Sequence, residues 1–155
     1  MKTEKEKGPC PICGRWKNRA MTVDSVVIRD GHVLLIRRNN DPFKGFWALP
    51  GGYMDFDETS QEAAMRELNE ETGLVAKGGD FIGVYSQPAR HPQQVVSAVY
   101  LVTEFTGKAI AGDDAAETAW FALDDIPSEL AFDHRQIIED AIKYFKTPRG
   151  GAQKQ

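Results

Sequence analysis

The segment Gly52–Leu74, GYMDFDETSQEAAMRELNEETGL, constrains the fold of this chain more than any other part of it. Thr59 is a favourable helix N-cap, and Glu62 three residues later completes a capping box. Gly73 is placed to end the helix as its C′ residue, where glycine accepts the left-handed conformation at little cost. The segment therefore predicts a helix with a defined start and a defined stop.

Three glutamates lie on one face of this predicted helix. Glu67, Glu70 and Glu71 are spaced at i, i+3 and i+4, and like charges at that spacing destabilise a helix by a few tenths of a kcal/mol. Arg66 is the one neighbouring cation in the segment. A cation is therefore expected on this face, and an all-oxygen ligand set suits Mg²⁺ or Mn²⁺ better than Zn²⁺.

A solvated acidic helix face is the alternative interpretation of the same glutamates. Two neighbouring features weigh against it. The loop Pro50–Gly52 reads Pro-Gly-Gly, which lets backbone approach a ligand closely. Ala64 and Leu68 belong to an adjoining apolar stripe that can fix the helix against a core.

The rest of the chain predicts strands around this helix and one further helix. Thr22–Arg29 and His32–Arg37 are apolar, β-branched runs joined by Asp30-Gly31, which favours a type I′ hairpin turn. Further elements are expected at Phe46–Leu49, Phe81–Ser86, Val95–Thr103, Thr118–Ala122 and, as a helix with an apolar stripe ending at Phe145, Asp133–Phe145. This order predicts an α/β (α+β) sandwich with a mixed sheet.

Length and charge limit the classes of function. A chain of 155 residues predicts one compact domain, here residues 21–146, with an N-terminal extension over 1–20 and a flexible tail over 147–155. The net charge of -4 argues against a basic nucleic-acid surface, and an anionic substrate would need a bridging cation. No apolar run approaches the roughly 20 residues of a membrane span, and the charged start lacks a signal peptide's apolar stretch. A cytoplasmic protein is expected.

Cys10 and Cys13, in the sequence CPICG, have the spacing of half a zinc knuckle. A closed structural zinc site normally needs four ligands, and no second cysteine pair exists. His32, His91 and His134 are scattered, and each is more often a turn, loop or packing residue than a ligand. A Zn²⁺ site shared between two subunits and an inert thiol pair both remain open.

The segment Gly52–Leu74 resembles the Nudix signature, G-x5-E-x7-R-E-U-x-E-E-x-G-U with U aliphatic, at every specified position. The resemblance implies a Nudix-type α/β/α sandwich and a pyrophosphohydrolase that cleaves a nucleoside diphosphate linked to another group. It also implies the metal ligands, namely Glu67, Glu70, Glu71 and the carbonyl of Gly51.

The same resemblance implies a catalytic set beside the ligands. Glu58 and Arg66 would pair and hold the loop and helix in shape. Glu70 belongs to this catalytic set and is also one of the implied metal ligands. A carboxylate outside the helix often supplies the general base, and Glu117 matches one such position. Asp113 and Asp114 lie in the same loop, where a solvated acidic loop is an equally good interpretation.

Similarity beyond the signature, over roughly residues 22–145, resembles the ADP-ribose pyrophosphatase branch. It implies hydrolysis of ADP-ribose to AMP and ribose 5-phosphate. Pro88 stands where that branch typically carries a proline, and Arg90 is expected to contact a substrate phosphate. Relatives tend to read Arg-Asp-Pro-Arg where this chain has Arg90 followed by His91, Pro92 and Gln93, so an acidic and a second basic residue are missing.

Other functions remain alternatives. One is hydrolysis of oxidised nucleoside triphosphates or of other dinucleotides such as NADH and diadenosine polyphosphates. Another is an ADP-ribose-sensing regulator without catalysis, which the intact glutamate set opposes and which would need a DNA-binding domain beyond the roughly ten residues that follow the last helix. The expected partner is a small-molecule nucleotide, without nucleic acid or membrane, and a homodimer is an option because many relatives form one.

Overall fold

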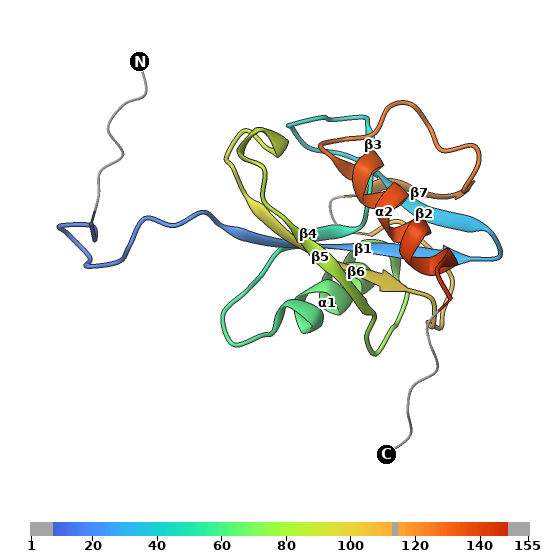
Figure 1. Cartoon of the computed structure of the whole chain (residues 1–155), viewed down its shortest axis with the longest axis horizontal. Helices are drawn as coiled ribbons and strands as arrows, with labels where there is room; N and C mark the ends of the chain where they lie inside the picture. The colour runs from blue at the N-terminus through green and yellow to red at the C-terminus, as the bar shows by residue number, and fades with distance from the viewer. Residues whose placement is uncertain (1–7, 113–114, 149–155) are drawn as a thin grey trace.

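The computed structural model describes residues 8–112 and 115–148, and in these residues one mixed sheet lies between two helices (Figure 1). The order β3-β2-β1-β6-β5 runs across the sheet, with β4 paired to β1 and β7 paired to β2. β1 and β6 are parallel and the other pairs are antiparallel. The elements are β1 (Met21–Arg29), β2 (His32–Arg38), β3 (Trp47–Ala48), β4 (Gly51–Tyr53), α1 (Ser60–Thr72), β5 (Asp80–Tyr85), a 3-10 turn (Pro88–Arg90), β6 (Val96–Val102), β7 (Ala115–Ala122) and α2 (His134–Lys146).

The sheet buries both of its faces, as alternate residues of β1 show. Val26 and Ile28 pack in one apolar cluster with Ile137 of α2. Val27, between them, packs in another cluster with Leu68 of α1. Since successive side chains of a strand point to opposite faces, the two helices cover opposite faces of the sheet. The expected α/β/α sandwich with a mixed sheet is confirmed.

The β1-β2 hairpin forms at the predicted turn. Asp30 has φ 49° and Gly31 has φ 71°, and two positive φ values in succession are the mark of a type I′ turn. This turn sets the register that pairs Ile28 with Val33. The hairpin brings the long, buried strands β1 and β2 together at the centre of the sheet.

The last helix and β7 differ slightly from the sequence expectation. β7 begins at Ala115, three residues before the predicted start. Phe145 was expected on the buried stripe of α2, but 47% of it is exposed, because the last turn of the helix extends past the apolar cluster that contacts Ile137 and Ile138. Residues 1–7 of the predicted extension and 149–155 of the predicted tail lie outside the described residues.

Across the part of the chain that the structure describes, no helix combines the length and the apolar character that crossing a membrane requires.

Truncating Leu68 tests whether packing holds α1 in place. Leu68 is fully buried between α1 and the sheet, so Leu68→Ala is expected to lower the free energy of unfolding by about 3 kcal/mol. Val84→Ala on β5, where the side chain is 53% exposed, is the control and should change it by less than about 0.5 kcal/mol. Urea unfolding followed by circular dichroism measures both, and equal losses would contradict the assigned packing of α1.

Candidate active site

The helix that carries the glutamates begins and ends where the sequence predicts. The Thr59 side chain accepts a hydrogen bond from the Glu62 backbone N–H at 3.2 Å, and the Glu62 carboxylate accepts one from the Thr59 N–H at 2.7 Å. Gly73 has φ 74°, and its N–H donates to the Asn69 carbonyl at 2.8 Å. These caps fix the rotation and the end of α1, and with them the direction of its acidic face.

Arg66 links the acidic face to the loop before the helix. Its Nε and Nη2 donate to the two carboxylate oxygens of Glu58 at 3.0 and 2.7 Å, and Nη2 also donates to the Tyr53 carbonyl at 3.0 Å. Its Nη1 donates to Glu67 at 2.9 Å and to Glu70 at 3.2 Å. The expected pair of Glu58 and Arg66 is therefore present, and the same guanidinium holds two of the three glutamates predicted as metal ligands.

The two charges of that pair stabilise one another. The hydrogen bonds from Arg66, together with one from the Asp55 N–H at 2.7 Å, lower the pKa of Glu58 to about 2. The hydrogen bonds to Glu58 correspondingly raise the pKa of Arg66. Glu58 is therefore an anion across the physiological range, and Arg66 is held as a cation between the loop and the helix.

The two glycines of β4 lie against the glutamates. The Gly51 N–H donates to the carboxylate of Glu71, which is buried, at 2.9 Å. A Cβ at Gly52 would lie 2.5 Å from the Glu67 carboxylate, and one at Gly51 would lie 2.1 Å from the Val23 carbonyl. A side chain at Gly51 would overlap the backbone of β1, and one at Gly52 would have to push the Glu67 carboxylate away, so the Pro-Gly-Gly loop is needed for the present approach of β4 to α1.

Glu67 is a half-buried carboxylate beside Arg66. Burial raises its pKa, and the hydrogen bond and charge of Arg66 oppose that rise. Glu70 is more exposed and adds repulsion. A single guanidinium therefore faces more carboxylate charge than it neutralises, which is an environment that favours an added cation.

The chemistry of the donors fits Mg²⁺ or Mn²⁺, because every side chain on this face offers carboxylate oxygen. Within residues 8–112 and 115–148, however, no three His, Cys, Asp or Glu side chains are grouped as ligands around one point. Glu67 and Glu70 turn toward Arg66, and Glu71 turns toward the Gly51 N–H. Binding an ion would require these carboxylates to exchange part of their present hydrogen bonds for the ion.

A cavity of about 350 Å³ opens beside Glu71 and β4. That volume lies in the range of small-molecule sites. Of the residues predicted for the site, Gly51, Glu71 and Arg90 line it, whereas Glu58, Arg66, Glu67, Glu70, Pro88 and Glu117 do not. The remainder of its wall comes from β1, β2, β4, the start of α2 and the connecting loops, and is formed by Thr22, Asp24, Ile36, Arg38, Asp41, Pro42, Leu49, Gly52, Tyr53, His91, Pro92, Gln93, Val95, Phe132 and His134.

A buried polar group in that wall was missed by sequence reasoning. Asp24 accepts a hydrogen bond from the Ser97 hydroxyl, and burial raises its pKa to about 7. His134 Nδ1 accepts from the Leu49 N–H at 2.9 Å, and its Nε2 lies 3.6 Å from Asp24. Burial lowers the pKa of His134 to about 3, so the ring is neutral and the contact with Asp24 is polar, not an ion pair. The available signal was an aspartate inside the apolar run of β1.

Arg90 lies in the cavity wall but is not a free surface cation. Its Nε and Nη2 donate to the two carboxylate oxygens of Asp133 at 2.9 and 2.8 Å, and its Nη1 donates to the Val95 carbonyl at 3.3 Å. Its side chain is 3% exposed. The bidentate pair ties the Pro88–Arg90 turn to the start of α2, and contact with a substrate phosphate stays a prediction.

The two positions that depart from the branch pattern also face the cavity. The His91 ring stacks on Phe132, with centroids 4.9 Å apart and planes 23° apart. The Gln93 side chain accepts a hydrogen bond from the Tyr53 hydroxyl at 3.0 Å. At these two positions the loop therefore presents an aromatic and an amide group to the cavity.

Glu117 does not line the cavity. It is on β7 opposite Arg37 of β2, with their side chains 3.4 Å apart. Its role as a base stays a prediction, and Asp113 and Asp114, the neighbouring candidates, lie outside the described residues.

Comparison with known proteins identifies the class to which this site belongs. Residues 18–141 match the NUDIX domain model. An ADP-ribose pyrophosphatase of Methanocaldococcus jannaschii is 46% identical over 126 residues, which cover 81% of this chain and 74% of that protein. The NUDIX domain of Shewanella oneidensis NrtR, solved in complex with ADP ribose, is 31% identical with a TM-score of 0.75, covering 84% of this chain and 91% of that one. An ADPR-responsive transcriptional repressor of Acinetobacter baylyi is 29% identical over 131 residues, covering 79% of this chain and 52% of the repressor.

The chain therefore belongs to the Nudix family, in its ADP-ribose pyrophosphatase-like branch, and is a Nudix hydrolase. The fold and the complete glutamate helix are those that the sequence resemblance implied.

The close approach of Gly52 to Glu67 can be tested by adding one methyl group. Gly52→Ala is expected to displace the Glu67 carboxylate and to lower kcat/KM on the order of 100-fold, because small misplacements in a site carry such costs. Gly83→Ala is the matched control, since its Cβ would meet its nearest neighbour, Tyr85, at 4.0 Å. Wild-type turnover by the Gly52 variant would show that the approach does not position Glu67.

Replacing Asp24 tests whether its buried carboxyl makes the free energy of unfolding depend on pH. The folded state holds the Asp24 proton up to about pH 7, whereas the unfolded chain loses it near 3.8, so wild-type stability from this group falls as pH rises through that window. Asp24→Asn removes this dependence, and the stability of the variant relative to wild type should therefore increase with pH. Urea unfolding across the window measures the difference, and a constant or decreasing difference would contradict the assignment.

Proposed function

We propose that this Nudix hydrolase uses Mg²⁺ or Mn²⁺ to hydrolyse ADP-ribose to AMP and ribose 5-phosphate. The observation that carries the proposal is the placement of a complete glutamate helix, held against two glycines, beside a cavity of about 350 Å³. The 46% identity to an ADP-ribose pyrophosphatase supports the choice of substrate.

In this proposal the metal is held by the carboxylates of Glu67, Glu70 and Glu71 and by the carbonyl of Gly51. A bound divalent ion would neutralise pyrophosphate oxygens and lower the pKa of a coordinated water. Arg66 keeps Glu67 and Glu70 turned toward one point in the absence of the ion. Glu58, which holds Arg66 by two hydrogen bonds, maintains that orientation.

Proton acceptance during hydrolysis is assigned to Glu70 ahead of Glu117. Glu70 shares the face of α1 with the proposed ligands, and at 42% side-chain exposure it is accessible to water. Glu117 is on β7, where its carboxylate pairs with Arg37. A carboxylate beside the attacking water is the kind of group that general-base catalysis needs.

The cavity wall offers the contacts for the remainder of the substrate. Tyr53 and Gln93 present a hydroxyl and an amide, groups that suit ribose hydroxyls. Arg90 is the proposed contact of a substrate phosphate, presented by the turn that Pro88 begins. Asp133 holds the guanidinium in a fixed orientation from the other side. A cytoplasmic location stays a prediction from the composition of the chain, and a homodimer stays a prediction of the family resemblance.

A panel of substrates with a matched pair of variants tests this function. The protein is incubated with Mg²⁺ and ADP-ribose, NADH, diadenosine polyphosphates, dGTP or 8-oxo-dGTP, and the products are separated. ADP-ribose should be the best substrate and should yield AMP. Glu71→Gln should lower kcat by about 100-fold or more. Glu139→Gln, an exposed glutamate of α2, should leave it unchanged.

Each other result identifies a different function. Preference for 8-oxo-dGTP or another dinucleotide would keep the hydrolase and overturn the ADP-ribose assignment. Tight binding of ADP-ribose without turnover would favour a sensor, which the complete glutamate set argues against. Equal activity of wild type and Glu71→Gln would remove the glutamate helix from the mechanism.

A further inference from the structure

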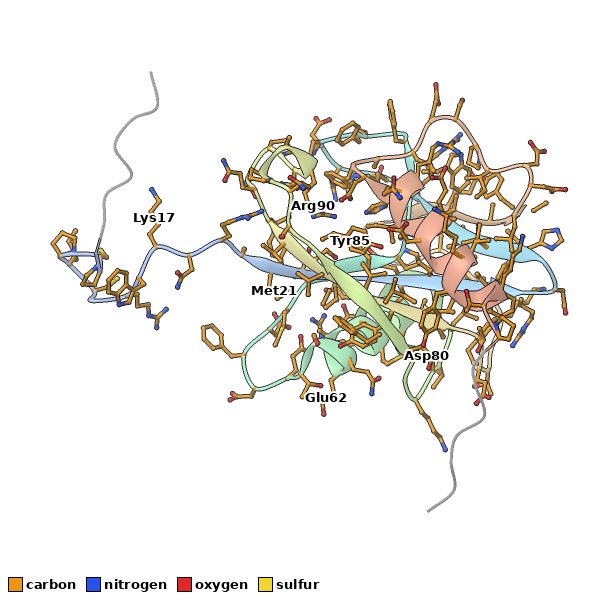
Figure 2. The ribbon with its side chains drawn as sticks, in the orientation of Figure 1. Lys17, Met21, Glu62, Asp80, Tyr85 and Arg90 are labelled. Carbon is orange, nitrogen blue, oxygen red and sulfur yellow. The ribbon has the colours of Figure 1, made fainter. Side chains whose placement is uncertain are left out.

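The cysteine pair lies in a small hairpin that projects from the domain and takes no part in the proposed hydrolysis. In Figure 1 the chain before β1 extends away from the sheet, and in Figure 2 Lys17 lies well outside the body of the domain while Met21 enters it. An antiparallel bridge between Pro9 and Trp16 closes the hairpin. The hairpin is therefore a separate local structure that needs its own explanation.

Backbone hydrogen bonds fold the cysteines to the same side of the hairpin. The Cys10 N–H donates to the Arg15 carbonyl at 2.7 Å, and the Gly14 N–H donates to the Cys10 carbonyl at 2.8 Å. Gly14 has φ 70°, a conformation that suits glycine and lets the chain reverse directly after Cys13. The two cysteines therefore sit three residues apart in one tight turn, which the Pro9–Trp16 bridge closes.

The turn also favours the thiolate, the form of cysteine that binds metal. The backbone N–H groups of Cys13 and Ile12 donate to the Cys10 sulfur, and they lower the pKa of its thiol. Both cysteines are free, and together with Arg15 and Trp16 they line a hollow in the hairpin surface. The positive charge of Arg15 suits a cluster of thiolates, which is negatively charged even around a divalent ion.

One chain does not complete such a site. Tetrahedral structural zinc takes four ligands, and this sequence has two cysteines. His134 and His91 are committed to the cavity wall, and His32 lies in the β1-β2 hairpin with its Nδ1 bonded to the Asp30 carbonyl. In the described part of the chain no third His, Cys, Asp or Glu joins the pair. A four-ligand site would therefore take its remaining ligands from outside the described part of this chain.

The surface of the hairpin points to the kind of molecule that supplies them. Ile12 is 94% exposed and Trp16 is 65% exposed, so two large apolar side chains flank the thiols without cover from the described part of their own chain. A second copy of the hairpin would supply the two remaining thiolates and cover this apolar surface in the same contact. Projection from the domain leaves room for the two hairpins to meet (Figure 1).

We propose that Cys10 and Cys13 of two copies of this chain bind one Zn²⁺ in a four-thiolate site that joins their N-terminal hairpins. Zinc binding displaces the thiol protons, and the ion then links two domains whose glutamate sites remain separate. The occupant is a second copy of this chain, in an isologous arrangement that closes at the dimer.

The full-length protein tests this when it is prepared metal-free under a thiol-free reductant and then titrated with Zn²⁺. Bound zinc is measured by plasma mass spectrometry and molar mass by light scattering during size exclusion. The variants are Cys10→Ser combined with Cys13→Ser, and Glu71→Gln, which alters the glutamate face and leaves the hairpin intact. Circular dichroism checks that each variant is folded.

The proposal expects one tightly bound zinc per two chains and a doubling of molar mass that a chelator reverses. Both should persist in Glu71→Gln and both should vanish in the folded double cysteine variant. Cobalt in place of zinc should give the sulfur charge-transfer band of a tetrahedral thiolate site. The proposal would be overturned by one zinc per monomer or by zinc retained in the double cysteine variant. It would also be overturned by a dimer that forms without zinc and without the two cysteines.

Discussion

The close approach of the Gly51–Gly52 backbone to the acidic face of α1 is the constraint on which the rest of the site depends. It holds the carboxylate of Glu71 by the Gly51 N–H and places Gly52 directly beside Glu67. Two independent attachments maintain it. Leu68 fixes the opposite side of the helix in the core, and Arg66 bonds the helix to the loop through Glu58. A helix of like charges is thereby held where a cation is favoured.

The charges on this face explain why α1 is stable without a bound ion and can still bind one. Arg66 compensates part of the carboxylate charge through Glu67 and Glu70, so the helix tolerates its acidic face. Burial of Glu67 leaves the compensation incomplete. A divalent ion would supply the remaining charge at the edge of the cavity, where the anionic groups of a nucleoside diphosphate would meet it.

Local sequence signals predicted the elements that position the site. They did not predict the contacts between residues that are far apart in the sequence. The capping box at Thr59 and the type I′ turn at Asp30 are each encoded within four residues, and both are present. The pair of Arg90 with Asp133 joins residues 43 apart, and no local pattern marks it. Asp24 could be noticed only as a charge within an apolar strand, because its partner Ser97 is 73 residues away.

Binding of Mn²⁺, followed by the electron paramagnetic resonance signal of the free ion, tests whether the glutamate face of α1 is the metal site. Wild-type protein is compared with a variant in which Glu67, Glu70 and Glu71 are all glutamine, and with Glu139→Gln as control. Wild type and the control should remove free Mn²⁺ from solution alike, and the triple variant should not. Unchanged Mn²⁺ binding by a folded triple variant would show that the glutamate face is not the metal site.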